Sequence, residues 1–330
     1  MITLGQKHEA VARLLAVELA EVESRFAAEL VSDLACVNDL ARHLEQYRGK
    51  MLRPMLVMLS GLATSPSGEL VDEHRTLSTV VEMVHMATLV HDDVLDDQDV
   101  RRRATTINRL RGNEAAVMLG DYLISHSYHL SASIGSQTAS RLIADATNTV
   151  CEGELLQLHN RNNWSLDEQT YFDIIRRKTA ALCGVACRLG ALYSGADKPT
   201  CDAMTQYGEL LGNAFQIVDD VLDLTGDAAV VGKSLGKDLE KGKLTLPLIH
   251  RLETAHPEQR QELIDLLRTP GPEQSERIGR ILAESDSLPY ARRRAEQLID
   301  QAKRAISILP DSPAHDTLIT IADAVITREF

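Results

Sequence analysis

The sequence predicts an all-helical protein, a bundle of ten or more helices around a central cavity. Proline, which interrupts helices, is absent between Pro66 and Pro199 and again from there to Pro247. Along these stretches apolar residues recur at spacings of three and four, and the patterns that mark β-hairpins are missing. Aromatic residues make up 4% of the chain while Leu, Ala and Glu are plentiful, so the composition also favours helices.

The expected helices follow one another without a linker, and we therefore expect a single domain over residues 1–330. The middle of the segment 73–97, VVEMVHMATLVH, is apolar almost all round, which indicates an interior helix. The expected helices cover 7–31, 36–48, the residues after Pro54, 73–97, 114–133, 138–160, 168–194, 201–224, 275–284 and 290–308.

Charge and hydropathy exclude two classes of partner. A net charge of -13 argues against binding a nucleic-acid backbone, which depends on clustered Lys and Arg. The apolar runs are shorter than the roughly 20 residues that span a bilayer, so we expect no stable membrane insertion. The start, MITLGQKHEA, has no apolar segment of signal-peptide type, and we expect a cytoplasmic protein.

Two acidic motifs share the five residues DDVLD: HDDVLDD at 91–97 and VDDVLDL at 218–224. Each ends an apolar helical run, so Asp92 and Asp96 lie one turn apart, as do Asp219 and Asp223. Like charges at this spacing destabilise a helix unless cations neutralise them. Ligand sets made only of oxygen favour Mg²⁺. A single copy would be explained by a solvated helix end, whereas two copies favour a metal site.

Basic residues accompany the acidic motifs. We expect Gly49, Lys50 and Arg53 in a turn before a helix. Further basic residues are Arg101, Arg102 and Arg103 after the first motif, Lys178 in RRKTAALCG, and Lys233, Lys237 and Lys243 after the second. Each alone would be an ordinary surface charge. Beside the aspartates, they suit a site that binds metal ions and diphosphates together.

With these motifs in this order, the sequence resembles the trans-isoprenyl diphosphate synthase (polyprenyl synthetase) family over nearly its whole length, as a single such domain. The matching motifs are GKMLRP at 49–54, the first acidic motif with RR at 101–102, GDYL at 120–123, KT at 178–179, FQIVDDVLD at 215–223 and GKSLGKDLEKGKLTLP at 232–247. The medium- and long-chain members, of octaprenyl or heptaprenyl type, are the most similar.

The resemblance implies a role for each matching residue. Contacts to the diphosphate of isopentenyl diphosphate are implied for Lys50, Arg53, His85 and Arg102. Magnesium ligands are implied for Asp92, Asp96 and Asp219, with Asp93, Asp220 and Asp223 as neighbouring or water-mediated ligands. Contacts to the allylic diphosphate are implied for Arg101, Lys178, Thr179, Gln216, Lys233 and Lys243. The six aspartates and Lys178 are the expected catalytic residues.

One segment departs from the family pattern. The family reads RRGxPT after the first acidic motif, whereas this chain reads RRRATT at 101–106. Arg103 therefore replaces a glycine and Thr105 a proline, which changes the expected loop conformation. Arg101 and Arg102 are retained, so the activity that the resemblance implies is not affected.

The implied reaction is a prenyl transfer. Three Mg²⁺ ions between the two motifs assist ionisation of an allylic diphosphate, of farnesyl or geranylgeranyl type, and the double bond of isopentenyl diphosphate attacks the cation. We expect a homodimer, while a heteromer in which this chain is the catalytic half stays open.

Product length depends on the cavity beneath the first motif. Ala87 or Thr88 lies one turn before Asp92, and Val84 lies two turns before it. Short-chain members of the family commonly have a bulky residue at the position of Ala87 or Thr88. The small residues here predict a medium- or long-chain polyprenyl diphosphate.

Three alternatives stay open. A short-chain synthase making farnesyl or geranylgeranyl diphosphate shares all the motifs. A class I terpene cyclase shares the aspartate chemistry, but it generally carries an NSE/DTE motif at the second site and has no use for an isopentenyl diphosphate pocket. A non-catalytic subunit of a heteromeric synthase usually lacks intact aspartate motifs, and both are intact here.

Overall fold

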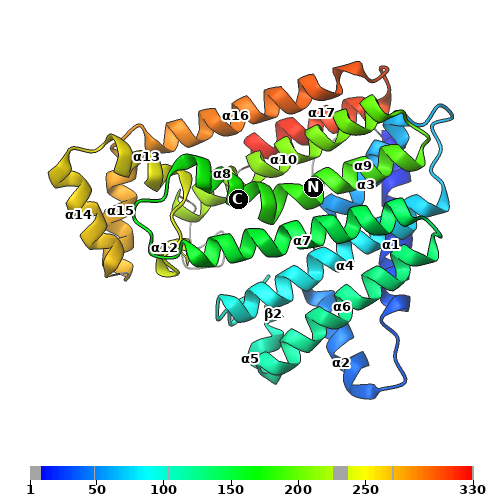
Figure 1. The fold of residues 1–330 in the computed structure, drawn as a ribbon, viewed down its shortest axis with the longest axis horizontal. Coiled ribbons are helices and arrows are strands. Elements are labelled where there is room, and N and C mark those ends of the chain that lie inside the picture. The colour runs from blue at the N-terminus through cyan, green and yellow to red at the C-terminus, as the bar shows by residue number, and fades with distance from the viewer. Residues whose placement is uncertain (1–8, 48, 103, 226–236, 270, 329–330) are drawn as a thin grey trace. The chain divides into compact units, whose positions relative to one another are not determined.

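The described residues of the computed structural model are 9–47, 49–102, 104–225, 237–269 and 271–328. They are almost entirely helical, which confirms the predicted class (Figure 1). No helix among them combines the length and the apolar character needed to cross a membrane.

The chain packs as two compact units. Unit 1 comprises Met1–Asn148, Leu182–Gly208 and Ala305–Thr320, and unit 2 comprises Thr149–Ala181, Glu209–Arg304 and Ile321–Phe330. Five helices of the described residues contribute to both units: α7 (Gln137–His159), α9 (Ala181–Tyr193), α10 (Lys198–Thr225), α16 (Ser287–Ala305) and α17 (Pro313–Ile326). That the chain is one family domain stays a prediction.

Unit 1 is built around α4 (Asp72–Leu95), the long interior helix that the sequence predicts (Figure 1). It packs against α6 (Asn113–Ser133) and α3 (Leu52–Thr64). The other elements of this unit are α1 (Glu9–Glu29), α2 (Ala35–Leu44), the 3₁₀ turns η2 (Glu45–Tyr47) and η4 (Ile306–Ile308), β1 (Val100–Arg101), β2 (Ala104–Thr105) and α5 (Ile107–Arg111).

The apolar core of unit 1 lies along the contact between α4 and α6. Met83, Ala87 and Val90 of α4 are fully buried and belong to one cluster with Leu119 and Leu123 of α6. These residues recur at spacings of three and four on each helix, which places them on one face. Burial of this stripe fixes the rotation of α4 and therefore the direction in which its acidic end points.

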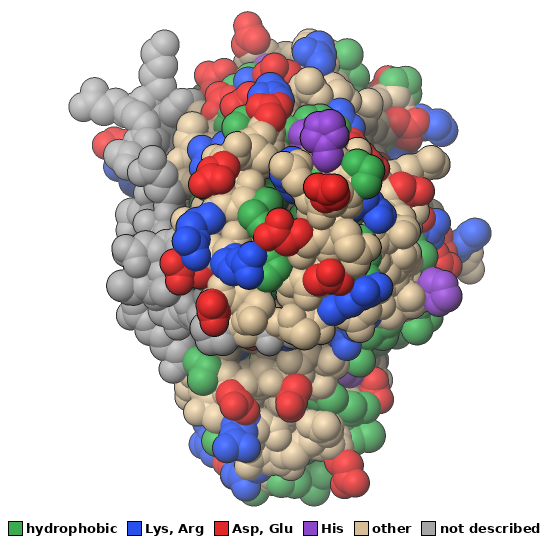
Figure 2. Space-filling view, turned by 90° about the vertical axis from the view of Figure 1, so that its left-hand side faces the viewer, with side chains coloured by type: hydrophobic (Ala, Val, Ile, Leu, Met, Phe, Trp, Pro, Cys, Tyr) green, Lys and Arg blue, Asp and Glu red, His purple; other side chains and the backbone are tan. Residues whose placement is uncertain are grey.

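Unit 2 contains α8 (Glu168–Ile175), the π-turn η3 (Arg176–Ala180), α12 (Lys237–Glu240), α13 (Leu246–Thr254), α14 (Pro257–Arg268), α15 (Pro272–Ala283) and α16 (Ser287–Ala305). Acidic and basic side chains are interspersed on the face formed by α14 and α15 (Figure 2). Arg277 and Glu262 pair there at 2.8 Å and are both about half exposed. Such surface pairs add little stability, and this mixture of charges is that of an ordinary solvated face.

Most expected helices form within a few residues of their predicted limits, but four details differ. The segment 168–194 is interrupted by the π-turn, and a short hairpin of β1 and β2 forms where the sequence showed no hairpin signal. Arg53 lies inside α3 and not in the turn before it, because Pro54 is tolerated in the first helical turn. The helices α5, α12, α13, α14 and α17 were not predicted.

A close approach of α9 to α3 is testable at Gly190. A Cβ atom there would clash with the carbonyl oxygen of Val57. We expect Gly190→Ala to lower the free energy of unfolding by about 1–3 kcal/mol, since overpacking outweighs the better helix propensity of Ala.

Gly279 of α15 is the matched control, because nothing lies within 4 Å of a Cβ there. Gly279→Ala should raise the free energy of unfolding by about 0.5–1 kcal/mol. Urea denaturation measures both, and equal effects of the two substitutions would contradict the close helix approach.

Candidate active site

The first acidic motif lies at the C-terminal end of α4 in unit 1. Asp92 and Asp93 are in its last turn, and Asp96 is the C-cap residue, whose N–H donates to the Asp92 carbonyl at 2.8 Å. A helix C-terminus carries partial negative charge, so carboxylates gathered there are unfavourable without nearby cations. The local structure therefore supports the cation requirement inferred from sequence.

Asp93 is the buried member of this motif. Its side chain is 1% exposed, and Arg101 of β1 binds its Oδ1 at 2.8 Å. Burial raises the pKa of the Asp93 carboxyl, while the Arg101 guanidinium acts in the opposite direction. Burial and the Asp93 charge also raise the pKa of the nearby Tyr47 hydroxyl, which accepts a hydrogen bond from the Ile107 N–H at 2.9 Å. The hairpin thus supplies the cation that holds Asp93.

Three arginines approach His85 in unit 1. Burial lowers the pKa of His85 well below its usual value, and the positive charges of Arg53, Arg102 and Arg101 lower it further. His85 is therefore neutral near pH 7 and can donate one hydrogen bond without adding charge. This group brings together three of the four residues expected to bind isopentenyl diphosphate.

Gly49 precedes the fourth residue, Lys50, which is exposed. The Arg102 guanidinium donates to the carbonyl oxygen of Tyr47 and lies where a Cβ of residue 49 would be. Arg102 itself has a φ of 49°, in the left-handed region, so the hairpin turn directs its side chain towards this loop. Arg103 lies outside the described residues, whereas Thr105 pairs with Val100 in the hairpin.

The second acidic motif lies near the C-terminal end of α10, in unit 2, and its buried member is Asp220. Tyr171 donates to Asp220 Oδ2 at 2.6 Å, and Gln216 Nε2 donates to Oδ1 at 2.8 Å. Thr179 in turn donates to Gln216 Oε1 at 2.9 Å. Burial and the charge of Asp238 raise the pKa of the Asp220 carboxyl well above its usual value, despite these hydrogen bonds.

The other two aspartates of this motif are less buried. Asp219 is half exposed, and Arg328 of the C-terminal segment lies 3.7 Å from its Oδ1. The Arg328 guanidinium also stacks on the Phe215 ring, 4.5 Å from its centroid. Asp223 accepts a hydrogen bond from the Asp238 N–H at 3.3 Å.

The lysines expected to bind the allylic diphosphate have acidic or polar neighbours. Lys178 lies in the π-turn, pairs with Glu154 and donates to Gln157 at 3.0 Å. Lys243 is largely buried, with Asp238 at 3.9 Å. Lys233 lies outside the described residues.

Sequence reasoning missed several of these partners. Glu154 and Gln157 occur in GELLQ of α7, and Arg328 follows the last described helix, α17. Tyr171 precedes Lys178 by seven residues, a spacing of two helical turns that could have indicated it. Asp238 belongs to the family motif that ends in GKDLEKGKLTLP, but the resemblance implies no role for it.

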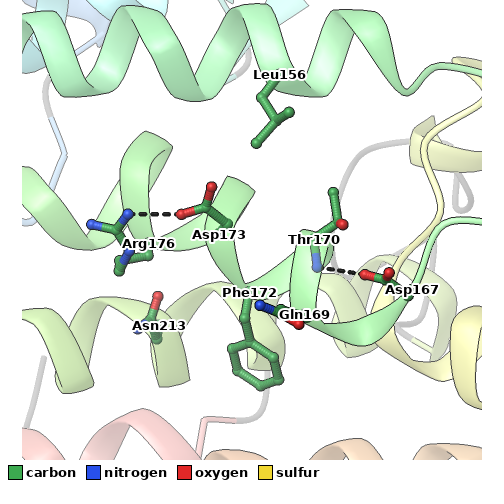
Figure 3. A pocket seen from close by; sticks show the side chains of 8 residues that line it. All are labelled: Leu156, Asp167, Gln169, Thr170, Phe172, Asp173, Arg176 and Asn213. Carbon is green, nitrogen blue, oxygen red and sulfur yellow. Dashed lines mark hydrogen bonds and ion pairs between the residues drawn. The ribbon is translucent and has the colours of Figure 1, made fainter.

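Unit 2 also contains a cavity of about 730 Å³ between α7, α8 and α10 (Figure 3). It is lined by Leu156, Asp167, Gln169, Thr170, Phe172, Asp173, Arg176 and Asn213, none of which the sequence analysis predicted as site residues. Asp173 pairs with Arg176 at 2.7 Å, and Asp167 accepts the N–H of Thr170 at 2.7 Å. Gln169, Thr170, Phe172 and Asp173 line the cavity from α8, and Tyr171 is not among its lining residues.

The acidic motifs fit magnesium by their donor chemistry. Within the described part of the chain, no three His, Cys, Asp or Glu side chains gather closely enough to form a complete metal site. Mg²⁺ typically takes only one or two carboxylates and completes its shell with water and substrate phosphates. Asp92 and Asp96 in unit 1 and Asp219 in unit 2 would hold such ions.

The residues expected to limit product length lie on α4. Ala87 and Val84 are fully buried, and Thr88 is partly buried with its hydroxyl bonded to the His85 carbonyl at 2.7 Å. Ala87 packs in the apolar cluster shared with α6, so a larger side chain there would have to displace members of this cluster. Its part in chain length stays a prediction.

Comparisons with known proteins agree with the resemblance. A family model described as polyprenyl synthetase matches residues 35–285. Octaprenyl diphosphate synthase of Escherichia coli (strain K12) is 34% identical over 322 residues, which cover 97% of this chain and 99% of that protein.

Two crystal structures have the same fold. A decaprenyl diphosphate synthase from Rhodobacter capsulatus superposes with a TM-score of 0.90 at 34% identity, covering 98% of this chain and 100% of that one. A polyprenyl synthase from Caulobacter crescentus CB15, complexed with calcium and isoprenyl diphosphate, superposes with a TM-score of 0.90 at 32% identity. The match covers 97% of this chain and 98% of that one.

The raised pKa of Asp220 has a testable consequence for stability. The ionised form of Asp220 is disfavoured in the folded protein. The free energy of unfolding therefore falls as the pH rises above about 3.9, the pKa of an aspartate in the unfolded chain. Asn cannot ionise, and its amide can still donate to the Tyr171 hydroxyl and accept from Gln216. Asp220→Asn should therefore raise the unfolding temperature by a few degrees at pH 8 and by less at pH 4.

Asp286→Asn serves as the control, because Arg293 lowers the pKa of the exposed Asp286 carboxyl. This change should slightly lower the unfolding temperature at pH 8. A gain from Asp220→Asn that is the same at both pH values would contradict the raised pKa.

Proposed function

Because the chain belongs to the polyprenyl synthetase family and is a trans-prenyltransferase, we propose that it makes a medium- or long-chain all-trans polyprenyl diphosphate. Its substrates would be isopentenyl diphosphate and an allylic starter of farnesyl or geranylgeranyl type. The observation that carries the proposal is the match over 97% of the chain to an octaprenyl diphosphate synthase.

Charges in unit 1 support binding of isopentenyl diphosphate beside α4. Arg53 and Arg102 offer planar groups with several N–H donors, suited to phosphate oxygens. Neutral His85 can add a hydrogen bond, and exposed Lys50 can add a further cation. The four residues would orient the substrate through its diphosphate and leave its double bond free to react.

Groups in unit 2 support binding of the allylic diphosphate. Lys178 and Thr179 are neighbours in the π-turn, and Thr179 donates to Gln216 to complete a set of three. Lys243 lies 3.9 Å from Asp238. Three Mg²⁺ ions, when bound by Asp92, Asp96 and Asp219, would neutralise diphosphate charge. Lys178 would compensate charge on the departing diphosphate, since its ammonium is the cation of this set.

Purified protein, isopentenyl diphosphate, labelled farnesyl diphosphate and Mg²⁺ test the proposal, with the products sized by chromatography. We expect prenyl diphosphates of medium or long chain. Products of geranylgeranyl length would support the short-chain alternative, and a hydrocarbon formed without isopentenyl diphosphate would support a cyclase.

Assembly and location remain part of the proposal. We propose a homodimer resident in the cytoplasm, and sedimentation of the purified chain tests the first part. A chain that gains activity only with a second, different subunit would favour the heteromeric alternative.

Asp92→Ala and Asp219→Ala should each lower turnover by at least about 10²-fold, since each removes a carboxylate that would bind the charge-stabilising metal. Stability without metal should not fall, because repulsion within the motif is relieved. Steady-state kinetics at saturating Mg²⁺ measures the effect. Asp265→Ala, an exposed change of the same charge on α14, is the control, and wild-type turnover in either motif variant would refute the metal assignment.

Ala87→Phe should shorten the product. The ring would occupy space between α4 and α6 one turn before the acidic motif, at a cost of about 1–3 kcal/mol in stability. Both diphosphate sites keep their residues, so the first condensations should continue.

Ala302→Phe is the control for overpacking, because Ala302 of α16 is equally buried. It should lower stability and leave product length unchanged. An active Ala87→Phe enzyme with wild-type products would mean that this face of α4 does not limit the chain.

A further inference from the structure

Tyr171 is a buried tyrosine of α8 with no role in the function described so far. Its side chain is 3% exposed, and its hydroxyl donates to Asp220 Oδ2 at 2.6 Å. Asp220 itself is 4% exposed, so solvent cannot readily replace this donor. A buried carboxylate that loses a hydrogen bond pays the full cost of its desolvation.

The two oxygens of Asp220 are held separately. Gln216 donates to Oδ1 at 2.8 Å, and its own carbonyl is fixed by the Thr179 hydroxyl at 2.9 Å. Oδ2 has Tyr171 as its donor. Each carboxylate oxygen can accept about two bonds, so both keep a lone pair for a water or a cation.

Other residues of α8 and of the adjoining π-turn line a cavity or are buried among apolar side chains. Thr170, Asp173 and Arg176 line the open cavity of about 730 Å³ (Figure 3). The Ile174 and Ile175 side chains are buried, but apolar contacts do not select one orientation of a carboxylate. The tyrosine hydroxyl is therefore a directional link between α8 and the acidic end of α10.

We propose that Tyr171 is a positioning residue for the second acidic motif, which holds Asp220 in one orientation and so sets how tightly α10 binds a divalent cation together with diphosphate. The inference rests on the proposed function, because it requires this motif to bind metal. Tyr171 acts through Asp220 and does not itself contact substrate.

Binding of Mn²⁺ in the presence of inorganic diphosphate, followed by electron paramagnetic resonance, tests the inference without turnover. Tyr171→Phe should weaken Mn²⁺ binding about tenfold, the scale of one hydrogen bond to a charged group. In kinetics, the Mg²⁺ concentration for half-maximal rate should rise similarly, while the KM for isopentenyl diphosphate stays unchanged.

Tyr290→Phe is the matched control, because that hydroxyl also donates to a carboxylate of unit 2, Glu168 Oε2, at 2.5 Å. It should leave Mn²⁺ binding unchanged. Equal weakening in both variants, or wild-type binding in Tyr171→Phe, would overturn the inference. A wild-type protein that binds no Mn²⁺ with diphosphate would instead refute the proposed function.

A double-mutant cycle shows whether Tyr171 acts through Asp220. On an Asp220→Asn background, Tyr171→Phe should weaken Mn²⁺ binding by less than twofold, and a further tenfold loss would overturn the inference. If Tyr171→Phe alone does not fold, Asp220→Asn should restore folding by removing the buried charge. A double variant that stays unfolded would count against the inference.

Discussion

Burial of one carboxylate in each acidic motif constrains the residues around both. The second aspartate of DDVLD, Asp93 or Asp220, is almost completely buried, whereas the first, Asp92 or Asp219, is more exposed. A buried carboxylate needs donors from another element. The hairpin of β1 and β2 provides one for α4, and α8 provides one for α10. Two segments that carry no part of the motif are thereby required by it.

The donors differ in charge, and the two motifs differ accordingly. Arg101 is a cation and partly offsets the cost of burying Asp93, whereas Tyr171 and Gln216 are neutral and leave Asp220 beside the charge of Asp238. Neutral donors therefore hold the buried carboxylate of the motif in unit 2, whereas a cation holds that of the motif in unit 1.

The sequence was sufficient for the class of fold and for the residues of the acidic motifs, because apolar periodicity and repeated carboxylates are local signals. It did not show that Arg101 and Tyr171 donate hydrogen bonds to Asp93 and Asp220. Arg101 was expected to bind substrate, which stays a prediction, and the structure adds that it pairs with Asp93. Tyr171 reaches Asp220 across 49 residues of chain, a contact that no local pattern encodes. The five unpredicted helices are mostly short or flanked by proline, where periodicity is weak.

The π-turn at Arg176–Ala180 determines which insertions and deletions this segment can tolerate. It fits one extra residue into a single widened turn between Tyr171 and the helix α9. Deleting one residue would convert the turn to ordinary helix and change the angular phase of α8 against α9 only slightly. The deletion would instead move Lys178 and Thr179, which lie in the turn, away from Gln157 and Gln216. A change in the length of this segment is therefore expected to disrupt the residues of the turn before it disrupts the flanking helices.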